Sequence, residues 1–151
     1  SGRSPWLATA GGLTRRISES VEPRLRNLLP DIGQAMRRHD PADRLDSDRI
    51  FAALGGCYLL RTVRDCRDSL ALNTLIDQIW TQLGNALDVH VERNLSLLRE
   101  RPNDPVVAAR LEAAVKMAEV RFGADYADII RRARESAEKK LAEQDLKRRS
   151  G

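Results

Sequence analysis

The chain has 151 residues, of which 42% are hydrophobic, 4% aromatic and 32% charged, and its formal net charge is +4. This length suits a single domain with a real core, because a chain of this size buries roughly 70% of the surface that it exposes when unfolded. The hydrophobic content excludes a disordered chain. No apolar run approaches the ~20 residues of a membrane span, so the sequence predicts no transmembrane segment.

Apolar residues recur at steps of three and four along most of the chain, and sustained period-two alternation does not occur. We therefore predict an all-α fold, a single-domain helical bundle of four to five mostly antiparallel helices with an extended C-terminal helix. Residues 1–12 are expected to form a flexible arm, and residues 13–45 short N-terminal helices and a linker. Residues 46–151 are expected to form the core bundle, with the C-terminal helix overhanging the body.

Residues 13–29 carry an amphipathic repeat that Pro23 interrupts. A proline inside a helix removes a backbone hydrogen bond, so we expect a kink or break near Ser20, followed by a separate short helix over residues 32–38. The opposite face of the first segment carries Arg15, Arg16, Arg24 and Arg26. A basic face of this kind suits contact with a membrane surface. Glutamates interrupt it, so packing of the apolar stripe into the core is the preferred interpretation.

After a polar linker at residues 39–48, a helix is predicted from Arg49 to about Arg67. Its apolar residues surround the helix axis, which is typical of a buried helix. Gly55 and Gly56 each cost roughly 1 kcal/mol relative to alanine, which indicates close approach of another helix or a break.

The end of this helix holds the densest charge group near the predicted core. Its members are Arg61, Arg64, Arg67, Asp65 and Asp68. Arg61 with Asp65, and Arg64 with Asp68, have the i, i+4 spacing of helical ion pairs. We therefore interpret the group as an ion-pair lattice in preference to an anion-binding site.

The helix predicted over residues 70–101 is exceptional because it has no Lys or Arg from Ser69 to Val91. One face is apolar, and the opposite face is made mostly of neutral polar residues. These residues are Asn73, Thr74, Asp77, Gln78, Thr81, Gln82 and Asn85. Depletion of charge is typical of the centre of an interface. Either a second copy or another protein covers this face, or residues 13–29 cover it within the same bundle.

Residues 102–105 predict a turn in which Asp104 caps a helix that begins at Pro105. A near-heptad stripe then runs from Val107 to Leu141 in one long helix that Gly123 is expected to kink. The C-terminal part is basic through Arg131, Arg132, Arg134, Lys139 and Lys140. A basic helix can follow phosphates. Interleaved acids and the lack of a stacking aromatic favour an ordinary solvated helix with cations near its C-terminus.

The apolar pattern also predicts which side chains fill the core. They are Ile50, Phe51, Leu54, Tyr58, Leu72, Ile76, Ile79, Leu83, Leu87, Val115, Phe122 and Ile129.

The sequence contains no signature of a nucleophile, a phosphate loop or a zinc site, so we expect no enzymatic activity, no cofactor and no metal. Asp88 and Glu92 share a helix face, but His90 points about 160° away from both. Cys57 and Cys66 would lie roughly 13–14 Å apart along one helix, too far for a disulfide. Reduced thiols predict a cytoplasmic protein.

These patterns favour a non-enzymatic helical protein–protein interaction module, such as an adaptor, chaperone or regulatory domain, that self-associates. The expected partner is another protein or a second copy of the chain. The residues expected to bind it are Asn73, Gln78, Thr81, Gln82, Asn85, Tyr126 and Ile129. The alternative is a nucleic-acid-binding protein that uses the Arg-rich C-terminal helix.

Overall fold

The computed structural model describes the backbone of residues 5–37, 44–66 and 73–151, and the side chains of these ranges from Glu19 onward. The described residues form α-helices and no strand, which confirms the all-α prediction. The helices are α1 (Pro5–Ala35), α2 (Ser47–Asp65), α3 (Asn73–Glu100), α4 (Pro105–Phe122) and α5 (Ala124–Ser150). No helix in these ranges is both long enough and apolar enough to cross a membrane.

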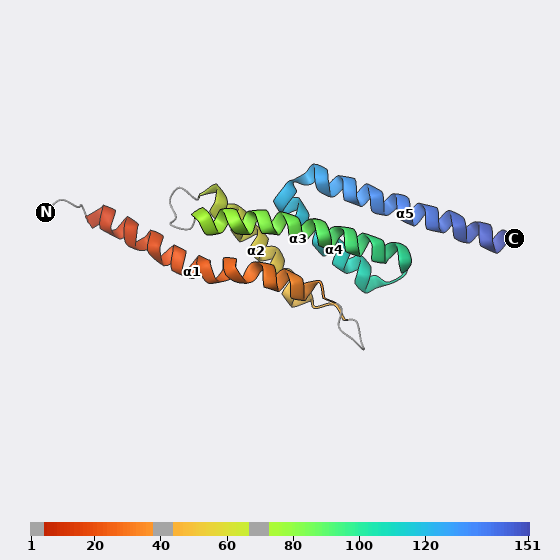
Figure 1. Ribbon diagram of the computed structural model, residues 1–151, viewed down its shortest axis with the longest axis horizontal. Helices are drawn as coiled ribbons and strands as arrows, with labels where there is room; N and C mark the ends of the chain where they lie inside the picture. Colours follow the sequence, from red (N-terminus) through yellow and green to blue (C-terminus); the bar gives the residue numbers. More distant parts are fainter. Residues whose placement is uncertain (1–4, 38–43, 67–72) are drawn as a thin grey trace.

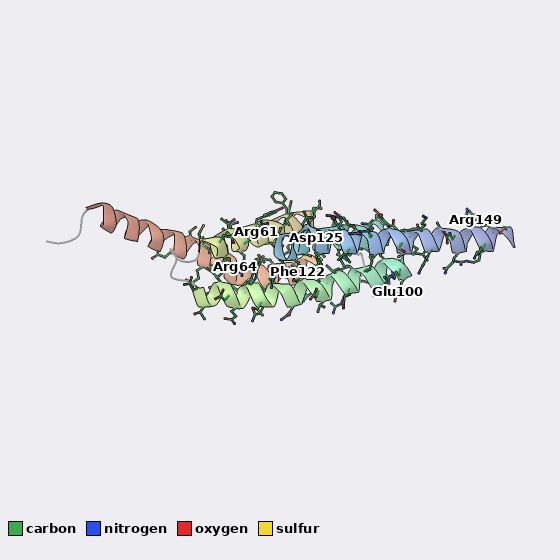
Figure 2. All side chains as sticks on the ribbon, turned by 90° about the horizontal axis from the view of Figure 1, so that it is seen from above. Arg61, Arg64, Glu100, Phe122, Asp125 and Arg149 are labelled. Carbon is green, nitrogen blue, oxygen red and sulfur yellow. The ribbon has the colours of Figure 1, made fainter. Side chains whose placement is uncertain are left out.

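Each helix runs roughly antiparallel to the one before it, so the described chain folds as an elongated bundle (Figure 1). The N-terminal half of α1 and the C-terminal half of α5 extend beyond the other helices at opposite ends. Figure 2 shows Arg149 on α5 far beyond Glu100, the last residue of α3. The predicted overhang of the C-terminal helix is therefore present.

The core lies between α1, α2, α3 and α4, with buried side chains along α3 from Ile76 to Leu98 and along α4 from Val107 to Val120. Five of the predicted core residues are buried, namely Ile76, Ile79, Leu83, Leu87 and Val115. Three more, Ile50, Leu54 and Phe122, are partly buried against this cluster. Leu72 lies outside the described residues.

Three predicted core residues are on the surface, and these predictions are wrong. Phe51 is 79% exposed, Tyr58 is 53% exposed and Ile129 is 59% exposed. For Phe51 and Tyr58 the reason is that α2 packs against α1, α3 and α4 but has one further side that no described helix covers, while Ile129 lies on the exposed side of α5. A helix that is apolar all round does not itself determine which of its sides receives no neighbour.

Helix α1 continues through Pro23 and Pro30, so the predicted break near Ser20 and the separate helix at 32–38 are wrong. Both prolines are exposed and face away from the buried stripe. The stripe consists of Val21, Leu25, Leu28 and Ile32. Each proline removes one backbone hydrogen bond on the exposed side of α1. Burial of this stripe on the other side stabilises the helix despite that loss.

Gly56 lies where α2 approaches α1. A Cβ atom at Gly56 would be 2.6 Å from Cδ1 of the buried Leu28, whereas one at Gly55 would meet no described atom within 4 Å. The predicted close approach of another helix is therefore present at Gly56. Gly55 has no such explanation within the described chain.

The beginning of α4 and its junction with α5 differ in how well the sequence predicts them. Asp104 accepts hydrogen bonds from the backbone N–H groups of Val106 and Val107 at 3.0 and 3.3 Å, so the predicted N-cap is confirmed. Gly123, with φ at 101°, separates two antiparallel helices in place of the single kinked helix that was predicted. A positive φ is open to glycine at little cost, which permits this one-residue reversal.

Candidate protein-interaction surfaces

The first candidate surface is the outer face of α3, here called the amide face. It consists of Asn73, Thr74, Gln78, Thr81, Gln82 and Asn85, and every one of these side chains is exposed. The helical period places them opposite the buried row of the same helix. They are therefore open to solvent in the single chain. Residues 13–29 do not cover them, so the alternative of a face covered within the same bundle does not hold.

Charge enters this side of α3 at the exposed Asp77, which lies among these residues one turn before Thr81, and at Asp88, which lies just beyond Asn85. Within the face, the hydroxyl of Thr81 donates to the carbonyl oxygen of Asp77 at 3.1 Å, a local bond that keeps this side chain close to the helix. One turn beyond Asn85, Val89 is 49% exposed and adds an apolar side chain to the same side of α3. Covering neutral polar side chains costs less hydration energy than covering charged ones, provided that the partner satisfies their hydrogen bonds.

The first turn of α5 lies beside the end of this face. The hydroxyl of Tyr126 donates to Oδ1 of Asp88 at 3.0 Å, and the Tyr126 ring lies 4.7 Å from that of Phe122 between centroids. Burial and the adjacent Asp88 raise the pKa of Tyr126 to about 12. Ile129, one turn after Tyr126, projects into solvent. The structure thus brings Tyr126 and the amide face onto neighbouring helices, with Tyr126 only partly exposed.

Trp80 joins α3 to the C-terminal ends of α2 and α4. The guanidinium carbons of Arg64 and Arg121 lie 4.5 and 4.3 Å from the centre of its ring, and Nε of Arg121 donates to the Trp80 carbonyl at 3.0 Å. Burial and the nearby Arg64 lower the pKa of Arg121. Arg64 therefore stacks on an aromatic ring, while Asp68, its predicted ion-pair partner, lies outside the described residues. Such stacking suits arginine because its planar cation is weakly hydrated.

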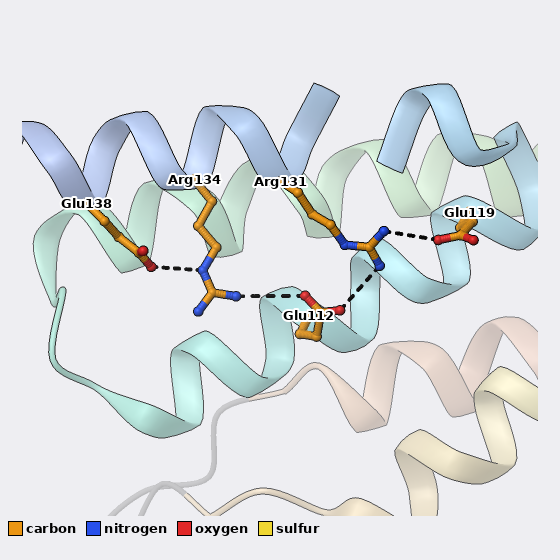
Figure 3. Close-up of polar contacts among 5 residues, drawn as sticks. All are labelled: Glu112, Glu119, Arg131, Arg134 and Glu138. Carbon is orange, nitrogen blue, oxygen red and sulfur yellow. Dashed lines mark hydrogen bonds and ion pairs between the residues drawn. The ribbon is translucent and has the colours of Figure 1, made fainter. Parts of the chain in front are cut away.

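Two arginines of the basic α5 segment face α4 and pair with its carboxylates (Figure 3). Arg131 contacts Glu119 at 3.2 Å and Glu112 at 3.3 Å, while Arg134 contacts Glu112 at 3.8 Å and Glu138 at 3.0 Å. The other three members of the predicted nucleic-acid set, Arg132, Lys139 and Lys140, are exposed. Since the paired arginines already lie against acids of their own chain, a phosphate would have to compete with those acids for them.

The second candidate surface is the outer side of α2, which the sequence placed in the core. Phe51 and Tyr58 project from it two turns apart. Next to Phe51, an apolar groove of about 330 Å³ runs between α2 and α4. Its lining includes Leu45, Ile50, Phe51, Leu54, Ala109 and Ala113, with Glu112 and Lys116 at its edge. Exposed aromatic side chains beside an apolar groove are typical of a binding surface.

The residues considered for metal or acid–base chemistry do not form a cluster. His90 is partly buried, and burial together with Arg93 lowers the pKa of its imidazole. Burial raises the pKa of the Cys57 thiol to about 12, so this cysteine is a core residue and a poor nucleophile. Over the part of the chain that the structure describes, no three His, Cys, Asp or Glu side chains gather closely enough to hold a metal ion.

Comparisons with protein-family models, with curated proteins and with solved structures find no match to this chain. Function is therefore inferred from the surfaces of the helices. The two most distinctive surfaces are the amide face of α3 and the aromatic side of α2. Both are exposed in the described part of the chain, and the second adjoins the apolar groove between α2 and α4.

Proposed function

We propose that the chain is a non-enzymatic helical protein–protein interaction module, as found in adaptors, chaperones and regulatory domains, and that it self-associates. The amide face of α3 binds the partner, which is another protein or a second copy of the chain. The partner lays a helix along this face and meets Tyr126 and Ile129 at its end.

The observation that carries this proposal is the exposure of six neutral polar side chains on one face of α3, in a chain that is 32% charged. A face whose only role was solvation would hold Lys, Arg and Glu, as the outer face of α5 does. Amide side chains both donate and accept hydrogen bonds, so they can pair with amides or backbone groups of a partner without burying an unpaired charge.

The double variant Gln78→Lys plus Gln82→Lys tests the proposal. It places two positive charges at the centre of the amide face, on exposed positions that a helix tolerates well. We expect the far-ultraviolet circular dichroism to remain that of the wild type and association to be lost. Solution mass is measured by light scattering at low and high salt, because an interface of neutral groups should resist salt whereas contacts between exposed charges are screened.

A matched control introduces the same two charges elsewhere, at Ser136 and Gln144 on the exposed side of α5. Ser136→Lys plus Gln144→Lys should leave the solution mass unchanged. Association that persists in the Gln78 and Gln82 variant would contradict the assignment of a second copy to the amide face. A wild-type protein that is monomeric at all concentrations and salts would contradict self-association itself.

A further inference from the structure

Trp80 on α3 contacts two arginines that come from two other helices. The guanidinium carbons of Arg64 on α2 and Arg121 on α4 both lie within 4.5 Å of the centre of its ring. All three residues are partly exposed, so the group is not sealed from solvent. We call these three residues the Arg–Trp–Arg cluster.

The guanidinium of Arg121 is fixed in position by its surroundings. Its Nε donates to the Trp80 carbonyl at 3.0 Å, and its carbon lies 4.9 Å from the centre of the Phe122 ring. The missing side chain of Gly84 gives it room, because a Cβ atom there would lie 3.0 Å from Nη2 and 3.3 Å from the guanidinium carbon. The terminal N–H groups of Arg121 have no acceptor among the described residues.

The cluster has features that are unfavourable in the chain alone. In the part of the chain that the structure describes, Nε of Arg64 is buried and has no hydrogen-bond partner. Burial and the nearby Arg64 lower the pKa of Arg121, because two cations lie close together with limited hydration. Stacking on Trp80 explains the position of each arginine, but it does not explain two unneutralised cations on one ring. Groups of this kind are concentrated at binding and catalytic sites.

The acids nearby do not neutralise the cluster. Among the described residues, no carboxylate forms an ion pair with either arginine. Asp88, whose charge acts on Arg121, accepts a hydrogen bond from Tyr126 at 3.0 Å. Asp77, one turn before Trp80, is engaged in another interaction. Asp65 follows Arg64 directly, so the helical period directs it about 100° away. The cluster therefore retains positive charge that an external anion can neutralise.

The charge of the cluster selects the kind of anion. Two guanidinium groups carry two positive charges, so a carboxylate or a phosphodiester, each with one negative charge, would leave one of them uncompensated. A phosphate monoester carries a charge of about −1.5 to −2 near pH 7, with three acceptor oxygens. Arginine matches such oxygens with paired N–H donors. Because the guanidinium groups already stack on Trp80, the ring does not offer a free platform for a nucleobase.

We propose that the Arg–Trp–Arg cluster binds the dianionic phosphate group of free phosphate or of a small phosphate monoester, with Arg64 and Arg121 as its ligands. One bound dianion neutralises both cations and supplies acceptors for their N–H groups. This site is separate from the partner contact proposed for the amide face.

The first test follows the fluorescence of Trp80 in a Trp6→Phe variant, in which it is the only tryptophan. At constant ionic strength, inorganic phosphate and methyl phosphate should each change this fluorescence saturably. Titration calorimetry on the unmodified chain should give the same dissociation constants. The tighter of the two ligands identifies free phosphate or an ester as the preferred source. Dimethyl phosphate, which carries a single charge, should bind about tenfold more weakly or less tightly still.

Substitutions locate the site. Arg64→Gln and Arg121→Gln should each weaken phosphate binding by about tenfold or more. The matched control Arg99→Gln removes the same charge near the far end of α3 and should leave the dissociation constant unchanged. Gly84→Ala changes no charge, but its Cβ atom displaces the Arg121 guanidinium. It should weaken binding severalfold without lowering the midpoint of thermal unfolding, because alanine favours the helix.

A pH series tests the charge of the ligand. A phosphate monoester takes up a proton as the pH falls through about 6, whereas sulfate keeps both charges. Between about pH 7.5 and pH 5, methyl phosphate should therefore bind about tenfold more weakly, while the affinity for sulfate stays constant. An equal loss for both anions would contradict selection of a dianion by the cluster.

The outcomes decide the proposal without reference to the partner. Saturable binding that the Arg64 and Arg121 variants weaken, and that Arg99→Gln retains, supports the phosphate site. Lack of saturable binding at millimolar phosphate overturns it, and so does binding that Arg99→Gln weakens equally, because that result indicates general charge attraction. Solution mass and phosphate binding are separate measurements, so the failure of either proposal leaves the other standing.

Discussion

The contact between Gly56 and Leu28 yields a double-mutant test of how α1 packs on α2. Gly56→Ala adds a Cβ atom 2.6 Å from Cδ1 of Leu28, closer than packed carbon atoms come without a shift. Leu28 is buried, so this methyl group cannot move away without displacing its core neighbours. Leu28→Ala removes the obstructing group and leaves a space in which the new Cβ fits.

The magnitudes follow from opposing terms. Alanine at position 56 gains about 1 kcal/mol of helix preference. Overpacking against Leu28 costs about 1–3 kcal/mol, so Gly56→Ala should lower the free energy of unfolding by about 0–2 kcal/mol. Leu28→Ala alone should lower it by about 2–5 kcal/mol. In that background Gly56→Ala should raise it by about 1 kcal/mol, which gives a coupling energy of about 1–3 kcal/mol between the two sites.

Urea unfolding followed by circular dichroism measures all four proteins, at concentrations where their solution masses agree. Gly33→Ala, on the exposed side of α1, serves as the control and should be mildly stabilising in both backgrounds. If Gly56→Ala were equally stabilising with and without Leu28, the close approach of α1 and α2 at this position would be refuted.

Asp104→Ala should lower the free energy of unfolding by about 1 kcal/mol in urea titrations, because α4 loses its N-cap, whereas Asp104→Asn should retain most of it. In a Tyr58→Phe background the remaining phenol, Tyr126, should titrate by ultraviolet absorbance at a pKa of about 12; since this lies above the ordinary ~10, the associated stability is present below pH ~10 and lost between ~10 and 12. If Tyr126 titrated at the ordinary tyrosine pKa, its partial burial beside Asp88 would be contradicted. A water-soluble thiol reagent should label the exposed Cys66 in the native protein and Cys57 only after unfolding, because Cys57 is buried with a pKa raised to about 12.

The elements that sequence predicts best are those with a local physical cause. The all-α fold follows from the three–four spacing of apolar residues, and the start of α4 follows from Asp104 and Pro105. The buried row of α3 was predicted for the same reason, since its apolar and polar faces differ clearly. The position of the amide face was predictable too, because it lies opposite that buried row on the same helix. Its exposure to solvent was not predictable, because it depends on where α1 packs.

The elements that sequence predicts poorly depend on distant contacts. The exposure of Phe51 and Tyr58 reflects which sides of α2 receive neighbours, and its composition is apolar on every side. Pro23 lies inside a helix because burial of the stripe beside it outweighs the lost hydrogen bond. Arg64 stacks on Trp80 from another helix, a contact that its own i, i+4 neighbours could not reveal. Each case is one in which tertiary packing overrides a local preference.

The one-residue junction at Gly123 also fixes how α5 is rotated about its own axis. Each residue of an α-helix advances the direction of its side chains by about 100°. Inserting a single residue beside Gly123 would therefore turn Arg131 and Arg134 away from Glu112, and Tyr126 away from α3, even if both helices remained intact. The length of this junction, as much as the identity of its glycine, determines which side of the overhanging helix faces solvent. Natural variation should consequently spare its length while it alters the exposed residues of α5.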